Sequence, residues 1–110
     1  MAFRAGFVVM APDADPKIHR ASIKIPKFEL TTVLIQLMNV DQAVDVCQEL
    51  VQKEGIQSLI LCPGFSYEAV AKVRNAVGEG VAINMAMGDV PSTMMTGEIL
   101  RKEGWFPEGH

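Results

Sequence analysis

The sequence is poor in the residue types that mark several classes of protein. Two cysteines, Cys47 and Cys62, in 110 residues are too few for the disulfide framework of a small secreted domain, so both thiols are expected to be reduced and mostly buried. No apolar run approaches the roughly 20 residues of a membrane-spanning helix. The apolar stretch 3–10 is short, and Pro12 and Asp13 follow it in place of a small-residue cleavage site. We therefore expect a cytoplasmic protein with no membrane partner.

A cluster of positive charge is also missing. The chain has 10 Lys and Arg residues against 13 Asp and Glu residues, which gives a formal net charge of −3. The densest basic stretch consists of His19, Arg20, Lys24 and Lys27, and Pro26 interrupts it. Because proteins that bind nucleic acid through its phosphates usually carry a basic face, we expect no nucleic-acid partner.

The composition that remains is that of a folded protein. Hydrophobic residues make up 49% of the chain and charged residues 21%. The length is typical of one domain, and two halves would be too small to bury separate cores. We therefore expect a single α/β domain over residues 1–110.

Runs of apolar and β-branched residues predict four strands, at 3–11, 31–40, 56–62 and 81–87. Amphipathic spacing and capping residues predict three helices: 41–55 with Asn39 or Asp41 as its cap, 67–77 after Ser66, and one from Ser92 or Thr93 to about residue 103. Segment 17–30 has no helical spacing and contains Pro26, which indicates a long extended connection.

The alternation of strands and helices determines the expected fold class. Strand–helix–strand crossovers are right-handed and place parallel strands side by side. The expected fold is therefore a small, largely parallel four-stranded open sheet with about three helices, built from flavodoxin-like or half-barrel-like βαβ units.

In such sheets, ligands bind at the carboxyl ends of the strands. The segment 62–66 (Cys-Pro-Gly-Phe-Ser) combines a thiol, a glycine, an aromatic ring and a hydroxyl at a helix start, and a helix N-terminus can hold a phosphate or carboxylate. The alternative is an ordinary turn with a serine cap. We predict that a small polar or anionic ligand binds at this edge, with candidate residues Cys62, Gly64, Phe65, Ser66, His19, Arg20 and Asn84.

A second hypothesis is that the protein is an enzyme. Cys62 with His19 as its general base predicts a small lyase or isomerase, against the alternative of an inert thiol. Asp13, Asp15 and His19 lack the spacing of a calcium or zinc site, so neither a metal nor a cofactor is expected.

Apolar residues late in the chain suggest self-association. Met85, Met87, Met94 and Met95 are expected mainly in the core. Residues 105–107 (Trp-Phe-Pro) are expected to fold back over the body or to form an interface. The third hypothesis is therefore a structural or interaction module without a ligand, and the favoured interpretation is a ligand-binding homo-oligomer.

Three features resemble a small family of uncharacterised bacterial and archaeal α/β proteins. They are the run from Ala11-Pro12 to Asp15 with His19-Arg20 downstream, the helix 41–55, and the turn Leu61-Cys62-Pro63-Gly64-Phe65 before a helix. Members of that family have Cys-Gly-Gly-Phe-Gly at this turn, and here Pro63 and Ser66 replace two of the glycines. The resemblance implies an α/β fold and no particular activity.

Overall fold

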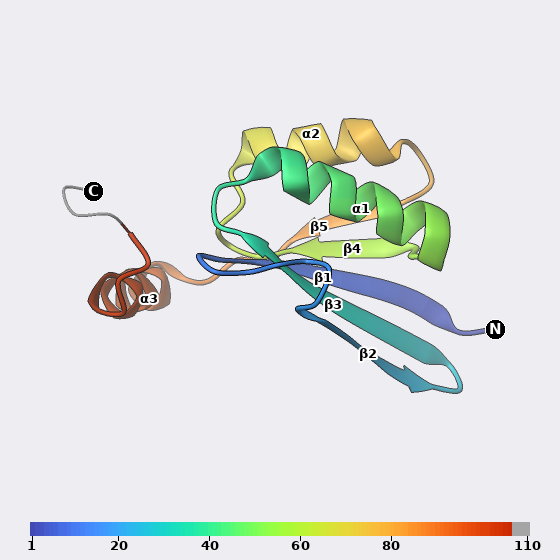
Figure 1. Cartoon of the computed structure of the whole chain (residues 1–110), viewed down its shortest axis with the longest axis horizontal. Helices are drawn as coiled ribbons and strands as arrows, with labels where there is room; N and C mark the ends of the chain where they lie inside the picture. The colour runs from blue at the N-terminus through green and yellow to red at the C-terminus, as the bar shows by residue number, and fades with distance from the viewer. Residues whose placement is uncertain (107–110) are drawn as a thin grey trace.

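The computed structural model describes residues 1–106 as five strands and three helices (Figure 1). In chain order they are β1 (Phe3–Ala11), β2 (Arg20–Ile25), β3 (Phe28–Gln36), α1 (Val40–Glu54), β4 (Ser58–Leu61), α2 (Tyr67–Val77), β5 (Ala82–Met85) and α3 (Val90–Lys102). The strands form one sheet in the order β2-β3-β1-β4-β5. All neighbouring pairs are parallel except β2 with β3. The predicted largely parallel α/β fold with three helices is confirmed.

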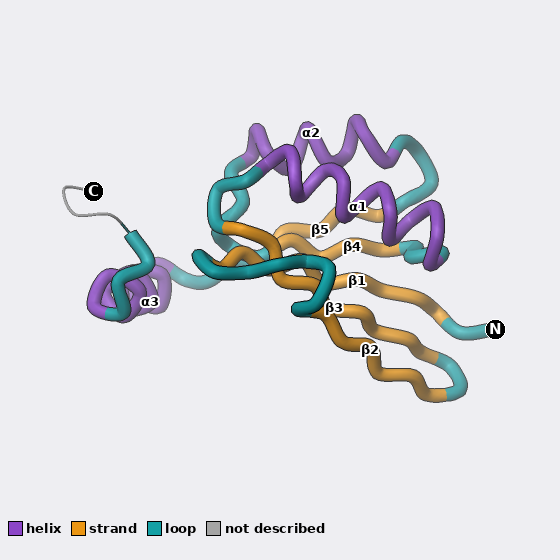
Figure 2. Tube along the Cα trace, viewed as in Figure 1, coloured by secondary structure: helices purple, strands orange, loops and turns teal. Residues whose placement is uncertain are grey.

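The count of four strands was one too low, because segment 17–30 is not a long connection. It contains β2, which pairs antiparallel with β3 through a turn at Pro26-Lys27 (Figure 2). β2 lies at the edge of the sheet, and its residues are mostly exposed, so no apolar run marks it in the sequence. The pairing also moves β3 to Phe28–Gln36, in place of the predicted 31–40.

The helices α1 and α2 both cover the same face of the sheet (Figure 1). Alternate residues of β1, β3 and β4 point to this face and pack with apolar residues of the two helices. The fully buried members with the largest side chains are Ile35, Leu50, Leu59, Leu61, Val8, Val33, Val73 and Cys47. Burial of this apolar surface is the main source of the stability of the fold.

Local signals fix both ends of α1. The Asn39 side chain accepts a hydrogen bond from the backbone N–H of Gln42, so Asn39 is the cap, as one of the two predicted alternatives had it. The Gln42 side chain does not complete a capping box, because its oxygen accepts from the backbone N–H of Gln36 instead. Gly55 ends the helix with φ of 69°, a left-handed conformation that favours glycine.

The opposite face of the sheet has no helix on it within residues 1–106 (Figure 1). We call it the open face. Its residues follow from strand alternation and register: Phe3, Ala5, Phe7 and Val9 of β1, Phe28, Leu30, Thr32 and Leu34 of β3, Ala21, Ile23 and Ile25 of β2, Ser58 and Ile60 of β4, and Ala82 and Asn84 of β5.

Helix α3 is set apart from the rest of the fold, beyond the carboxyl edge of the sheet (Figure 1). It contains no buried residue. Met94 and Met95 within α3 are 69% and 66% exposed, and Met87 before it is 76% exposed, so the expectation that the late methionines fill the core is wrong for these three. No helix among residues 1–106 is long and apolar enough to cross a membrane.

Candidate functional site

A cavity of about 560 Å³ lies at the carboxyl edge of the sheet, between the strand ends and α3. We call it the edge cavity. One wall consists of the end of β1, the residues just after β3 and the turn before α2. The other wall consists of α3 and the two aromatic residues after it. The lining residues are Val9, Met10, Leu37, Met38, Cys62, Pro63, Gly64, Gly88, Ser92, Thr93, Thr96, Gly97, Leu100, Trp105 and Phe106.

The lining is apolar apart from a row of hydroxyl groups on α3. Ser92, Thr93 and Thr96 supply these groups, and none of the lining residues in the described part of the chain carries a charge. Asp89 caps α3 by accepting a hydrogen bond from the backbone N–H of Ser92, and this bond lowers the pKa of the Asp89 carboxyl. The cap places the hydroxyl-bearing first turn of α3 at the cavity.

Cys62 stands at the end of β4 and contributes its thiol to the cavity wall. The residue is 7% exposed, and its Sγ accepts a hydrogen bond from the backbone N–H of Met10 at 3.4 Å. Gly64 packs against the same two side chains, since a Cβ on it would lie 3.4 Å from Met10 Sδ and 3.5 Å from Cys62 Sγ. Two of the seven predicted ligand-binding residues, Cys62 and Gly64, therefore line the cavity.

The other two residues of this turn have structural roles. Phe65 is 4% exposed and belongs to the hydrophobic core. The Ser66 hydroxyl accepts a hydrogen bond from the backbone N–H of Ala69 and caps α2. Because neither residue lines the edge cavity, the ordinary-turn alternative describes this half of the segment.

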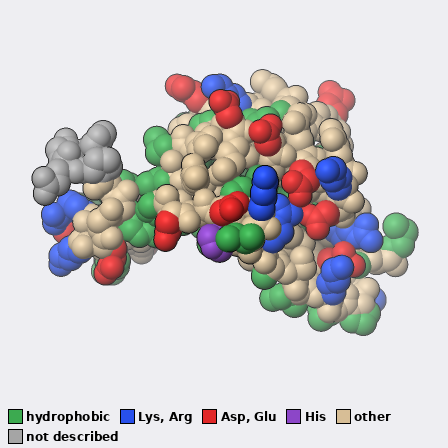
Figure 3. Space-filling model, viewed as in Figure 1, with side chains coloured by type: hydrophobic (Ala, Val, Ile, Leu, Met, Phe, Trp, Pro, Cys, Tyr) green, Lys and Arg blue, Asp and Glu red, His purple; other side chains and the backbone are tan. Residues whose placement is uncertain are grey.

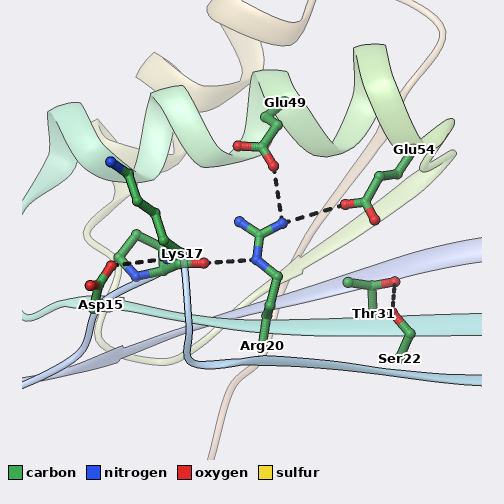
Figure 4. Close-up of polar contacts among 8 residues, drawn as sticks. Asp15, Lys17, Arg20, Ser22, Thr31, Glu49 and Glu54 are labelled. Atoms are coloured by element: carbon green, nitrogen blue, oxygen red, sulfur yellow. Dashed lines mark hydrogen bonds and ion pairs between the residues drawn. The ribbon is translucent and has the colours of Figure 1, made fainter.

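His19 ends the loop after β1 and Arg20 begins β2, and both lie outside the cavity lining. Figure 4 shows the polar contacts of Arg20. His19 Nδ1 accepts a hydrogen bond from the backbone N–H of Asp15 at 2.8 Å. Arg20 donates to the backbone oxygen of Pro16 and forms ion pairs with two carboxylates of α1, those of Glu49 at 3.0 Å and Glu54 at 3.7 Å. The Arg20 contacts fasten this segment to α1, and His19 Nδ1 and two of the Arg20 nitrogens are engaged by groups of the protein itself.

Asn84 lies on the open face, away from the cavity lining. Its side-chain amide donates to Ser58 Oγ and to the backbone oxygen of Leu59. Among residues 1–106, no three His, Cys, Asp or Glu side chains are grouped so that they could hold a metal ion. The structure therefore brings together only the Cys62–Gly64 part of the predicted set.

The sequence did not indicate most of the residues that line the cavity, because they come from segments that do not border the turn 62–66. Met38 lies at the rim with φ of 64°, an uncommon left-handed backbone for a residue with a side chain. Trp105 is half-buried there and Phe106 is 40% exposed. Of the residues 105–107 that were expected to fold back over the body or to form an interface, Trp105 and Phe106 line the edge cavity, and Pro107 lies outside the described residues.

A model of a family of unknown function (DUF6506) matches residues 3–97. The chain belongs to the DUF6506 family. The resemblance to a family of α/β proteins without an assigned activity is thereby confirmed. No curated protein and no solved structure matches the chain.

The DUF6506 match includes both walls of the edge cavity. It extends from β1 through the Cys62–Gly64 turn to Gly97 in the middle of α3. Leu100, Trp105 and Phe106 line the cavity beyond the matched range. The family description assigns no activity to this edge, so the chemistry of the cavity rests on the residues themselves.

The two cysteines of this DUF6506 protein are expected to differ strongly in reactivity. Burial raises the pKa of the Cys47 thiol from 9.0 to about 12, so at pH 8 its thiolate fraction falls about 1,000-fold. We predict that iodoacetamide modifies Cys62, at the cavity wall, at least about 100-fold faster than Cys47. Peptide mapping by mass spectrometry over time measures both rates. Urea-unfolded protein is the control, in which the two rates should converge, and equal rates in the native state would contradict the prediction.

Proposed function

We propose that this protein binds a small molecule in the edge cavity. The observation that supports the proposal is the cavity itself: its volume of about 560 Å³ lies within the usual 300–1,000 Å³ of small-molecule sites. Its place at the carboxyl edge of a largely parallel sheet is the common position of ligands in α/β proteins. The left-handed Met38 at the rim adds support, because strained backbone is concentrated at binding sites.

The lining favours a ligand with an apolar body and one uncharged polar group. Apolar side chains from both walls would surround the body, while Ser92, Thr93 and Thr96 offer hydroxyl groups to a donor or acceptor. The anionic ligand expected from the sequence has less support, because Arg20 is paired with Glu49 and Glu54 and stands outside the lining. A carboxylate in a cavity without a facing cation would lose its hydration without compensation.

A matched pair of probes tests this chemistry. We expect 1-octanol to raise the melting temperature of the protein, and octanoate, which has the same chain length and a negative charge, to raise it less. The physical reason is that both probes bury an apolar chain of the same length, while only octanoate also incurs the cost of removing water from a carboxylate. Differential scanning fluorimetry over a concentration series measures the effect.

A substitution at Gly97 tests whether 1-octanol binds in the edge cavity. A Cβ at Gly97 would meet no atom within 4 Å, so a Phe side chain has room to enter the cavity without displacing the core. Gly97→Phe is expected to weaken 1-octanol binding at least about 10-fold by occupying apolar volume. Gly97→Ala is the matched control: it leaves most of the volume and stabilises α3 by about 1 kcal/mol. Unchanged binding by Gly97→Phe, or no response of the native protein to either probe, would overturn the proposal.

A further inference from the structure

The open face is an apolar surface of unusual extent for a chain of this size. Ile23 and Ile25 are 67% and 57% exposed, Phe3 is 50% exposed, and Phe3 stacks on Phe28 with ring centroids 5.6 Å apart. In α/β proteins a parallel sheet is normally covered on both faces. Here α1 and α2 cover one face only, and the third helix stands apart from the sheet (Figure 1).

The total surface of the chain shows how much covering is missing. The chain exposes 7475 Å², whereas a monomeric protein of 12.0 kDa exposes about 6,000 Å². Residues 107–110 account for at most roughly 600 Å² of this difference even if fully exposed. The remaining excess of about 900 Å² is comparable to the ~800 Å² that each partner buries in a stable protein–protein interface, and it includes the exposed sides of α3 as well as the open face.

Helix α3 presents a complementary apolar surface. Its row Thr93, Thr96, Gly97 and Leu100 lines the edge cavity. Two apolar pairs at i, i+4 spacing flank this row, one on each side of it: Val90 with Met94, and Met95 with Ile99, each at least half exposed. A helix that is apolar over so wide an arc is normally buried on more than one side.

We infer that the open face binds α3 of a second copy of this chain, so that two protomers form a two-fold dimer in which each supplies its α3 to the other. α3 keeps the Thr93–Leu100 row on its own edge cavity and packs the Met95–Ile99 pair on the partner. The contact is self-complementary, because one chain carries both the uncovered sheet face and the uncovered helix. The inference is independent of the proposed ligand binding.

The dimensions of the two surfaces agree. A helix of 13 residues is about 20 Å long. Five strands at about 4.8 Å spacing make a sheet about 19 Å wide, so α3 can cross the whole open face. Figure 3 shows hydrophobic side chains gathered beside α3 and again along the edge formed by β2.

Sedimentation equilibrium on the full chain tests the dimer. We expect the native protein at micromolar concentration to have twice the chain mass of 12.0 kDa. Ile23→Lys on the open face and Met95→Lys on α3 should each weaken the dimer about 100-fold or more, because each buries a charge without a partner. Both residues are exposed in the single chain, so neither change disturbs the protomer fold. Tyr67→Lys on α2, at a residue 75% exposed, is the matched control and should leave the mass unchanged.

Cross-linking then identifies what lies on the open face. Chains carrying Ile23→Cys are mixed with chains carrying Met95→Cys, both with Cys62→Ser, and treated with a short bismaleimide. A cross-linked pair that forms in the mixture and in neither chain alone supports the inference. A cross-link between two Ile23→Cys chains would show the sheets packing face to face and would overturn it. A monomeric native protein, or a cross-link within one chain carrying both cysteines, would also overturn it.

Discussion

Leu59→Ala is expected to lower the free energy of unfolding by about 3–4 kcal/mol. Leu59 is fully buried in β4, between β1 and β5, and faces the helices. Truncating a buried leucine removes its transfer free energy and leaves a cavity, with a typical total of about 2–5 kcal/mol. The cavity should close poorly, because Leu59 packs against Gly6, which has no side chain to move into the space. Against a typical stability of about 5–15 kcal/mol, the loss is large.

Urea denaturation at a fixed protein concentration measures this difference. Leu59→Met is the control, because it nearly conserves the volume and should cost less than about 1.5 kcal/mol. A fixed concentration is required, since self-association would add to the apparent stability. A loss below about 1 kcal/mol for Leu59→Ala would mean that β4 does not pack beneath the helices as described.

Gly6→Val is expected to destabilise the protein by about 2–3 kcal/mol through overpacking. Gly6 lies in the central strand β1 on the face under the helices, where a Cβ would approach Leu59 Cδ2 to 3.1 Å and Ile56 Cγ2 to 3.3 Å. A valine adds two further carbons to an already tight contact. Thermal and urea unfolding of the variant provide the measurement.

A double-mutant cycle distinguishes steric crowding between Gly6 and Leu59 from a general loss of stability on replacing a glycine. Gly6→Ala should be destabilising in the native background and less so, or stabilising, with Leu59→Ala, because the new methyl enters the space that Leu59 leaves. We expect a favourable coupling of about 1 kcal/mol between the two changes. Additive effects would contradict the contact between Gly6 and Leu59.

The elements that strong local signals mark were predictable from the sequence. The apolar run of β1, the Asn39 and Ser66 caps and the Gly55 stop each act over a few neighbouring residues, so their effect can be read without knowing the fold. β2 could not be recognised in the same way. Its residues become a strand only because β3 offers hydrogen-bonding partners on one side, while its side chains stay exposed.

One part of the candidate site was likewise predictable from the sequence, and another part was not. The turn at Cys62 and Gly64 was predictable, because the end of a parallel strand before a helix is a known position for ligands. His19 and Arg20 were predicted to join this turn, yet His19 Nδ1 and two nitrogens of Arg20 are engaged by Asp15, Pro16 and two carboxylates of α1. Such partners are brought together by folding, and the residue types alone do not reveal them.

By itself the sequence determined the α/β class, most of the strands and the two capped helices α1 and α2, because periodicity and capping are local properties. Only the tertiary structure decided the hairpin of β2, the cavity that Cys62 and Gly64 line together with α3 and Trp105, and the bare open face. Each of these depends on contacts between segments distant in the chain, and the free energy of such contacts is set by which surfaces meet. The expected site has thereby become a cavity with an apolar lining and a row of hydroxyl groups.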